Sequence, residues 1–454
     1  MVAQCGHLID LRQMPLPNVT VCCVSETGSS MRVVAPNNET SPSAVSSCDA
    51  VDVVMQFGAM MIGAGNTATR TREMMDAVAR RLGLDGLAVS FSLDSITASV
   101  RHSGGWMTVV RETGPPAVNV SQIAELERFI KTLGPEPAPH DIKLKLATIR
   151  AAAHQYSVSQ IVAAVAMASA GFAFINGAAV PEMMAAAIGG GIGQWLRMRL
   201  SRIRLNHYGA VALSAAAASG IFVIVARLAG LAGWEFVHYP AGFIASVLFL
   251  VPGFPLIAGL FDLSQYQAVA AVSRFAYGAM LLLSVALGLS FVIAVAGIDI
   301  TRQPPLELTY ALKFLLRGVA SFIAGGAFAM VFNTPWRMAL AAGCLALVAN
   351  SLRFILTDMG MMPAPAAFCA ALVVGLIAIL FDRQLNVPRL ALTVAPIVIM
   401  IPGISAFEMI VLFNHGRMVE ALQASAAFGF VIGALAMGLA TARFFRPKNV
   451  APLP

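Results

Sequence analysis

The chain has 454 residues, 58% of them hydrophobic and 12% charged, and a formal net charge of +7 at pH 7. A soluble domain has about 25% charged residues, so this composition excludes a protein that is soluble along its whole length. The basic excess does not indicate a nucleic-acid partner, because the sequence has no aromatic ribonucleoprotein motif and no paired zinc-finger spacing. Six cysteines occur without a CxxC pair, and we expect no metal site and no cofactor.

The first third of the chain has the composition of a soluble protein. Residues 1–50 are rich in Ser, Asn, Pro and Thr and lack apolar periodicity, which predicts a disordered tail. Residues 51–134 predict a cytosolic α+β domain. It opens with a long helix over Val51–Leu84, which Gly63 and Gly65 partly interrupt.

Alternating apolar residues then predict short strands, and a capped helix follows. The strands cover Leu87–Leu93, Ser95–Val100 and Trp106–Val110, and the helix covers Val120–Thr132. Residues 135–156 predict a proline-rich linker and then an amphipathic helix that leads into a bilayer.

From residue 157 onward, the chain consists of apolar segments of about 20 residues, the length that a helix needs to cross a bilayer. We predict ten membrane helices, five in residues 157–300 and five in residues 305–446. The fold class is a mostly α, polytopic membrane protein with a small N-terminal α+β domain. The predicted spans are Ser157–Asn176, Pro181–Met198, Tyr208–Gly230, Ala241–Phe261, Arg274–Gly297, Leu312–Phe332, Trp336–Leu356, Ala364–Phe381, Leu390–Phe413 and Leu422–Arg443.

Basic residues predict the orientation of these helices. The end of the second span and the loop that follows it carry Arg197, Arg199, Arg202 and Arg204. The positive-inside rule places this loop, the N-terminal domain and both chain termini in the cytoplasm. We therefore expect a multi-pass protein of the bacterial inner membrane, with the lipid bilayer as a partner; a homo-oligomer is compatible with the sequence.

Two apolar segments are interrupted by a proline-glycine pair, at matching places in the two sets of five spans. Proline stops or kinks a helix, and paired broken helices in corresponding halves predict a transporter with inverted repeats and a midplane substrate site. The exposed start of each half-helix favours an anionic group, such as a substrate carboxylate. The candidate substrate-binding residues are Pro252, Gly253, Phe254, Pro255, Pro402, Gly403, Ile404 and Ser405.

The second span of each set carries a loosely matching motif, Gln194-Trp-Leu-Arg197 in the first and Asn350-Ser-Leu-Arg353 in the second. We add Asn350 to the candidate substrate-binding residues. We expect Arg353 to pair with Asp358 at the outer surface.

Three carboxylates lie in apolar surroundings, and intramembrane acids are costly unless they have a function. Glu408, Asp262 and Glu182 are therefore candidates for proton coupling. The sequence has no Walker loop and no HExxH or GxSxG motif, so we expect a transporter driven by an ion gradient, most simply protons, and not an enzyme.

These residues resemble those of a known family. Gly58-Ala-Met-Met-Ile-Gly-Ala-Gly-Asn-Thr-Ala-Thr-Arg-Thr-Arg-Glu73, with Arg80-Arg-Leu-Gly83, is similar to the opening of the threonine/serine exporter family. Leu248–Ile257 and Ile399–Ile404 resemble the family's two membrane motifs. The resemblance covers about Val51 to Arg446, and both membrane halves lie in one chain.

The resemblance implies a cytosolic N-terminal domain, about ten spans and secondary export of threonine and serine. Members of the family that are split into two proteins have also been linked to dicarboxylate export, so an exporter of dicarboxylates such as succinate is an alternative. A ligand-gated channel or sensor is a further alternative, with the N-terminal domain responding to a cytosolic ligand.

Overall fold

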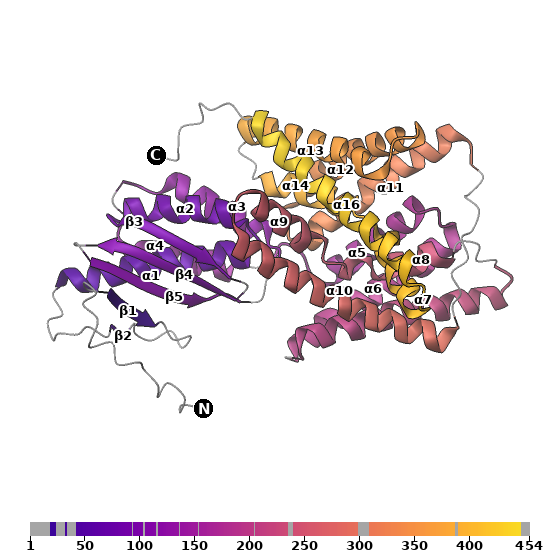
Figure 1. Ribbon diagram of the computed structural model, residues 1–454, viewed down its shortest axis with the longest axis horizontal. Helices are drawn as coiled ribbons and strands as arrows, with labels where there is room; N and C mark the ends of the chain where they lie inside the picture. The colour runs from indigo at the N-terminus through magenta and orange to yellow at the C-terminus, as the bar shows by residue number, and fades with distance from the viewer. Residues whose placement is uncertain are drawn as a thin grey trace.

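The computed structural model describes most of the chain. The described residues are 19–23, 32–33, 42–92, 94–102, 105–114, 117–135, 137–152, 154–203, 205–234, 239–297, 308–385 and 389–445. Most of the tail predicted for residues 1–50, and the loop predicted between the two sets of spans, lie outside them. An N-terminal α+β domain sits beside a larger, entirely helical region (Figure 1).

The N-terminal domain has four helices and a five-stranded sheet of order β2-β1-β5-β4-β3. Strands β3, β4 and β5 form an antiparallel meander, and β1 joins β5 in parallel. The helices are α1 (Pro42–Gly63), α2 (Ala68–Arg81), α3 (Val120–Thr132) and α4 (Pro139–Ala151). The strands are β1 (Val19–Cys23), β2 (Arg32–Val33), β3 (Asp85–Phe91), β4 (Ser95–His102) and β5 (Gly105–Glu112).

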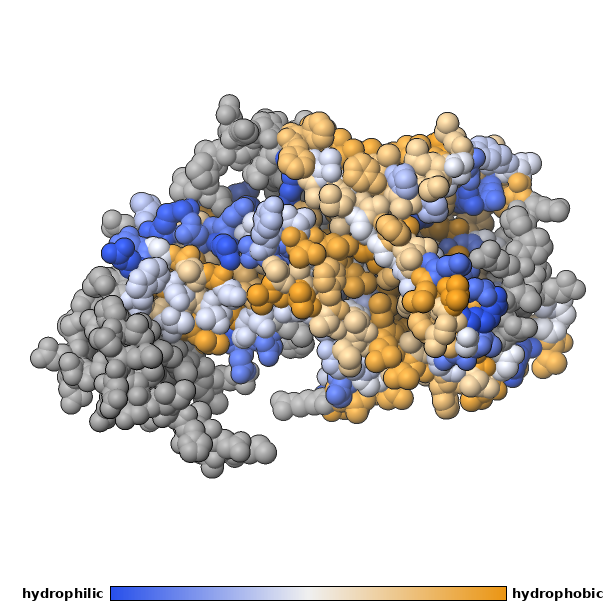
Figure 2. All heavy atoms as spheres, in the orientation of Figure 1, coloured by the Kyte–Doolittle hydropathy of each residue, from blue (hydrophilic) through white to orange (hydrophobic). Residues whose placement is uncertain are grey.

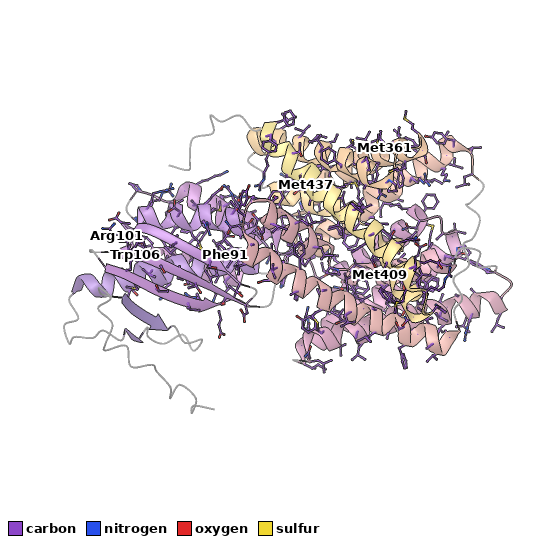
Figure 3. All side chains as sticks on the ribbon, in the orientation of Figure 1. Phe91, Arg101, Trp106, Met361, Met409 and Met437 are labelled. Atoms are coloured by element: carbon purple, nitrogen blue, oxygen red, sulfur yellow. The ribbon has the colours of Figure 1, made fainter. Side chains whose placement is uncertain are left out.

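Alternation along the strands divides the sheet into two faces. Side chains at every second position of a strand share one face, and on β4 the buried face carries Ile96, Ala98 and Val100. Strand β4 also contacts α1. Arg101 and Trp106 are exposed and lie near one end of the sheet (Figure 3). The domain therefore has its own apolar core between the sheet and its helices.

The predicted strands of this domain are confirmed with shifted ends, and the helix over Val120–Thr132 has the predicted ends. The long helix over Val51–Leu84 is two helices, because the chain turns at Gly65, whose φ of +96° suits glycine. Helix α1 starts at Pro42, inside the segment expected to be a tail, and β1 and β2 also lie in that segment.

The helical region contains twelve α-helices and two short 3-10 helices among the described residues. Polar residues begin several of the helices; Ser157, for example, forms a reciprocal capping box with Gln160 at the start of α5. The α-helices are α5 (Val158–Ile175), α6 (Val180–Arg202), α7 (His207–Leu231), α8 (Tyr239–Val247), α9 (Gly253–Ser264), α10 (Ala268–Ala296), α11 (Tyr310–Val331), α12 (Trp336–Asp358), α13 (Pro363–Leu385), α14 (Arg389–Val398), α15 (Gly403–Asn414) and α16 (Met418–Ala442). The 3-10 helices are η2 (Leu248–Leu250) and η3 (Arg443–Phe445).

Seven of the described helices are long and apolar enough to cross a membrane, and nine spans result if each bent helix pair counts as one. We expected ten, and the helix outside this set is α6. Its glycines, together with Gln194 and the arginines of its last turns, lower its hydropathy. Apolar side chains cover much of the visible surface of the helical region (Figure 2), as in a multi-pass membrane protein, where lipid is the solvent.

Candidate functional site

The two proline-glycine breaks have nearly the same backbone geometry. Pro252 has φ −77° and ψ 53°, and Pro402 has φ −76° and ψ 76°. In each break, the glycine amide donates to the carbonyl two residues earlier at 2.8 Å, which is the hydrogen bond of an inverse γ-turn. The helices on either side are bent by 62° at the first break and 44° at the second.

The two breaks lie against each other. A Cβ atom added to Gly253 would lie 2.1 Å from Cδ1 of Ile401, and one added to Gly403 would lie 2.8 Å from Cδ1 of Leu248. Each glycine thus approaches an apolar side chain on the N-terminal side of the other break. The structure therefore brings together the two segments that the sequence singled out, although they are about 150 residues apart.

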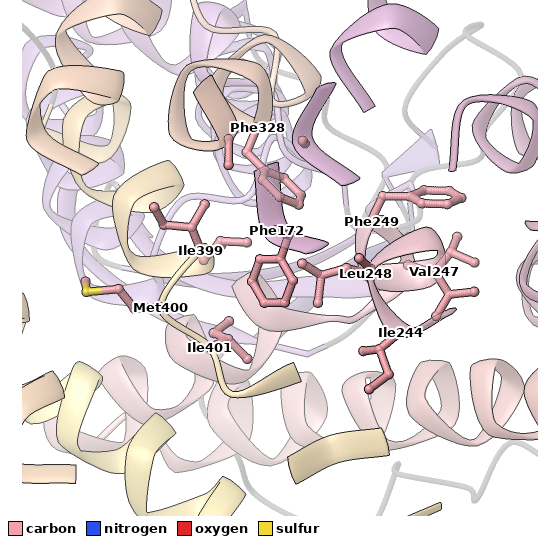
Figure 4. Packing of buried hydrophobic residues seen from close by; sticks show 14 of the residues in the cluster. Phe172, Ile244, Val247, Leu248, Phe249, Phe328, Ile399, Met400 and Ile401 are labelled. Atoms are coloured by element: carbon pink, nitrogen blue, oxygen red, sulfur yellow. The ribbon is translucent and has the colours of Figure 1, made fainter. Parts of the chain in front are cut away.

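Apolar side chains fill the space around this crossing. Figure 4 shows Phe172, Leu248 and Ile401 close together at the crossing, with Ile399 and Met400 on the adjoining segment before the second break. All five residues are buried. The crossing is thus packed with buried apolar side chains, which we call the apolar seal.

The two half-helices that begin at the breaks differ in the backbone donors that they present. In α9 the amides of Gly253 and Leu256 are bonded and Pro255 has no amide hydrogen, so Phe254 supplies the remaining donor of the first turn.

In α15 the amides of Gly403 and Ala406 are bonded. Ile404 and Ser405 then supply two donors, and Ser405 adds a hydroxyl, so α15 offers the better start for an anion.

Arg353 lies at the second break. Its Nη1 donates to the carbonyl oxygen of Met400 at 2.9 Å, where the end of α14 leaves carbonyls without helical partners. The expected pairing of Arg353 with Asp358 is wrong, because the cation nearest Asp358 is Arg317, at 3.6 Å. Periodicity alone could not separate the two arginines, since both lie near the outer ends of predicted spans.

Asn350 is one turn before Arg353 on α12 and is fully buried. Its Nδ2 donates to Ser321 Oγ of α11 at 2.7 Å, and that hydroxyl donates to the Arg317 carbonyl. The Asn350 Oδ1 atom is buried without a hydrogen-bond partner among the described residues. A buried acceptor of this kind is costly unless something binds it.

The three candidate acids lie in three different places. Glu182 is fully buried at the start of α6, beside Gly242 of α8. Glu408 is half-buried on α15, just beyond the second break. Asp262 is fully buried near the end of α9 that faces the N-terminal domain. Across the described residues, no three His, Cys, Asp or Glu side chains group closely enough to hold a metal ion.

Asp262 joins the helical region to the N-terminal domain. Its Oδ1 accepts the amide of Ala68, the first residue of α2, at 2.9 Å, and its Oδ2 lies 3.0 Å from Nε of Arg274 on α10. Arg274 also donates to the carbonyl of Asn66, at 2.6 Å. A carboxylate at a helix start is favourable, so Asp262 caps a helix of the other domain.

A second junction lies at the turn between α11 and α12. The amide of Val120 donates to the Phe332 carbonyl at 3.0 Å, and Asn333 Nδ2 donates to Asn119 Oδ1 at 2.9 Å. Tyr156 donates its phenolic hydrogen to the Thr334 carbonyl at 2.6 Å, and burial raises the pKa of this phenol. The N-terminal domain is thus hydrogen-bonded to two parts of the helical region that are about 70 residues apart in the sequence.

A cavity of about 260 Å³ lies between the N-terminal domain and the helical region. One wall is polar and consists of Asn66, Thr67, Thr69, Arg70, Glu73 and Glu127 from α2, its preceding turn and α3. The other wall is mainly apolar and comes from α9, α13, α14 and α16, with Arg443 at its edge. These helices surround the place where the N-terminal domain meets the helical region (Figure 1).

Arg70 is the centre of the polar wall. Its Nε lies 3.2 Å from Glu127 and its Nη1 lies 3.1 Å from Glu73. Burial lowers the pKa of Arg70, but the two carboxylates outweigh burial and raise the pKa above its ordinary value. The guanidinium therefore stays charged. Sequence patterns could not reveal this cavity, because its two walls come from segments about 130 to 380 residues apart.

A small α+β domain joined to membrane-crossing helices, two of them broken and crossing each other, defines a polytopic membrane protein of the transporter class. Two family models match the chain: one for a threonine/serine exporter over residues 52–296, and one described as "Threonine/Serine exporter, ThrE" over residues 317–445. The chain belongs to the threonine/serine exporter family, with both halves in one polypeptide. This family is one of transporters and not of enzymes.

Among curated proteins, the chain is similar to an uncharacterized protein of Haemophilus influenzae, with 33% identity over 152 residues. The match covers 31% of this chain, and the chain spans about half the length of that relative, 51%. No solved structure matches the chain.

Proposed function

We propose that this protein is a secondary exporter of small hydroxylated amino acids, threonine and serine foremost, across the bacterial inner membrane. The observation that carries the proposal is the crossing of the two broken helices at Gly253 and Gly403. Broken helices that meet are the usual place for a transporter's substrate site. The family to which the chain belongs supplies the substrate class.

The proposed architecture is a 5+5 inverted repeat, with α6 as the tenth span. Matching contacts support it. Helix α6 packs against α8 as α12 packs against α14, and α9 packs against α10 as α15 packs against α16. The half-helices α9 and α15 both have 12 residues. The two halves would rock about the crossing, so that the apolar seal opens to one side at a time.

The proposed substrate site uses the donors of the half-helices. The carboxylate binds at the start of α15, where Ile404 and Ser405 present amides and a hydroxyl, with Phe254 of α9 opposite. Exposed carbonyls near the breaks bind the ammonium group, and Asn350 Oδ1 is a further acceptor. Pro252, Pro255 and Pro402 keep these backbone groups out of regular helices.

Proton antiport is the proposed energy source, since the chain has no Walker loop. Glu408 is the leading candidate because it is half-buried and follows the second break within the same half-helix. Asp262 and Glu182 are the other candidates, although Asp262 also holds the N-terminal domain. The N-terminal domain and both termini are proposed to be cytoplasmic, as the positive charges predict.

The test is efflux from cells loaded with a threonine-containing dipeptide. Cells that express the protein should lose threonine faster than empty cells, and a Gly253→Leu/Gly403→Leu variant of equal membrane abundance should lose it at the empty-cell rate. Equal loss from all three would overturn the threonine assignment. A dicarboxylate exporter is the second candidate, because Arg353 supplies a cation at the second break. It predicts that succinate competes with threonine flux in proteoliposomes.

A further inference from the structure

The cavity between the N-terminal domain and the helical region has the chemistry of a binding site for a small zwitterion. Two guanidinium groups, of Arg70 and Arg443, and two carboxylates, of Glu73 and Glu127, line it, so its charges balance. Its volume of about 260 Å³ lies just below the roughly 300–1,000 Å³ of pockets that hold drug-sized ligands. The site therefore fits a small metabolite that carries both signs of charge.

Unpartnered polar atoms in the wall indicate where a carboxylate would bind. Asn66 is 3% exposed, and its Nδ2 has no hydrogen-bond partner among the described residues. The hydroxyl of Thr69, at the start of α2, is also buried and unpartnered there. Buried donors left unpaired are costly. Two such side-chain donors in one wall make it a receptor for an anionic group, in addition to the start of α2, whose Ala68 amide already binds Asp262.

The same wall also supplies negative charge, which an ammonium group requires. The ion pairs of Arg70 use one oxygen of Glu127 and one of Glu73, and a carboxylate has acceptor capacity on both oxygens. An ammonium group can therefore bind to these acids. Across the cavity, Phe254 and Ile257 of α9 and Ile397 of α14 supply an apolar surface for a side-chain methyl group.

We propose that this cavity is a loading site for a zwitterionic amino acid on the cytosolic side, and that the N-terminal domain supplies its polar half. This proposal rests on the proposed function for the identity of the ligand. The site adjoins both breaks, because Phe254 follows the first and Val398 precedes the second. A ligand held there lies directly below the apolar seal. The N-terminal domain is then part of the transport path, and not only a regulator.

The experiment measures binding of L-threonine to the purified full chain by isothermal titration, with succinate as a second probe. Asn66→Asp keeps the oxygen that accepts the Thr67 amide but replaces the free donor with a negative charge. It should weaken threonine binding at least tenfold. Thr69→Val should weaken it about threefold to tenfold, and Thr148→Val, an exposed threonine outside the cavity, should leave it within about twofold.

Glu127→Gln tests the ammonium side, and Glu125→Gln on the same helix is its matched control. Threonine amide, which lacks the carboxylate, and N-acetylthreonine, which lacks the ammonium, should both fail to compete. Each variant must elute as the wild type does in size-exclusion chromatography, so that weaker binding reports the site.

The two proposals fail in different ways. In the first case, the Gly253→Leu/Gly403→Leu variant loses threonine export, whereas Asn66→Asp, Thr69→Val and Glu127→Gln keep both threonine export and threonine binding. This result would overturn the loading site and leave the exporter intact. In the second case, these three variants weaken threonine binding, but the wild-type protein exports no threonine. This result would support the binding site and overturn the export function. Binding of succinate in place of threonine would overturn the zwitterion assignment.

Discussion

Substituting alanine for Gly253 tests whether the two broken helices touch as described. The added Cβ would lie 2.1 Å from Ile401 Cδ1, while ordinary van der Waals contact begins at 3.4 Å. The first break must therefore move about 1.3 Å away from the second, or the Cδ1 end of Ile401 must turn to another rotamer within the buried seal. Overpacking of this kind costs about 1–3 kcal/mol.

A second substitution, at Ile401, should relieve this clash. Ile401→Val removes the Cδ1 atom, and the next atoms near the added Cβ lie at 3.6 and 3.8 Å, which is ordinary contact. Alone, Ile401→Val should cost about 0.5–1.5 kcal/mol. The double variant Gly253→Ala/Ile401→Val should cost no more than Ile401→Val alone, so the coupling in the double-mutant cycle should be about 1–3 kcal/mol.

The assay is thermal unfolding of the four purified proteins, with threonine efflux at matched abundance as the second readout. Gly209→Ala is the control, because an added Cβ there meets nothing within 4 Å. The direct contact between the breaks would be refuted if the destabilisation of the double variant equals the sum of the two single-variant destabilisations to within about 0.5 kcal/mol. An efflux rate that recovers in the double variant would link this contact to transport.

Three further variants test the other parts of the site. Arg353→Gln removes the cation that donates to the Met400 carbonyl and should destabilise the second break by about 1.5–3 kcal/mol, seen as a lower melting temperature. An unchanged melting temperature would show that the Arg353 hydrogen bond does not stabilise the end of α14. Asp262→Asn leaves the buried Arg274 without its charge partner, so we expect a loss of about 3–5 kcal/mol and faster proteolysis of the N-terminal domain; equal proteolysis rates would contradict this. Glu408→Gln should flatten the pH dependence of export, and an unaltered pH profile would remove Glu408 from the proton path.

The breaks and the small domain could be predicted from the sequence because their signals are local. Proline and glycine fix the breaks whatever surrounds them. The helix at Val120–Thr132 has the predicted ends because Asn119 caps it through the amide of Gln122. The strands follow from alternation of apolar residues.

The contacts between distant segments could not be predicted in this way. Asp262 and Ala68 are 194 residues apart, and nothing near Asp262 in the sequence indicates that it caps a helix of another domain. The same holds for Asn333, which bonds to Asn119. A buried carboxylate in an apolar run suggested proton coupling by default, whereas its observed partners are an amide and a guanidinium.

The two junctions of the N-terminal domain have a kinetic consequence. One junction holds α9 and α10 through Asp262 and Arg274, and the other holds the turn between α11 and α12 through Asn333. If the two halves rock against each other, a rigid domain cannot keep both junctions throughout the cycle. Release of one junction would then be a separate step with its own barrier. In such a cycle the N-terminal domain would act as a brake, because turnover would be limited by the rate at which one junction is released.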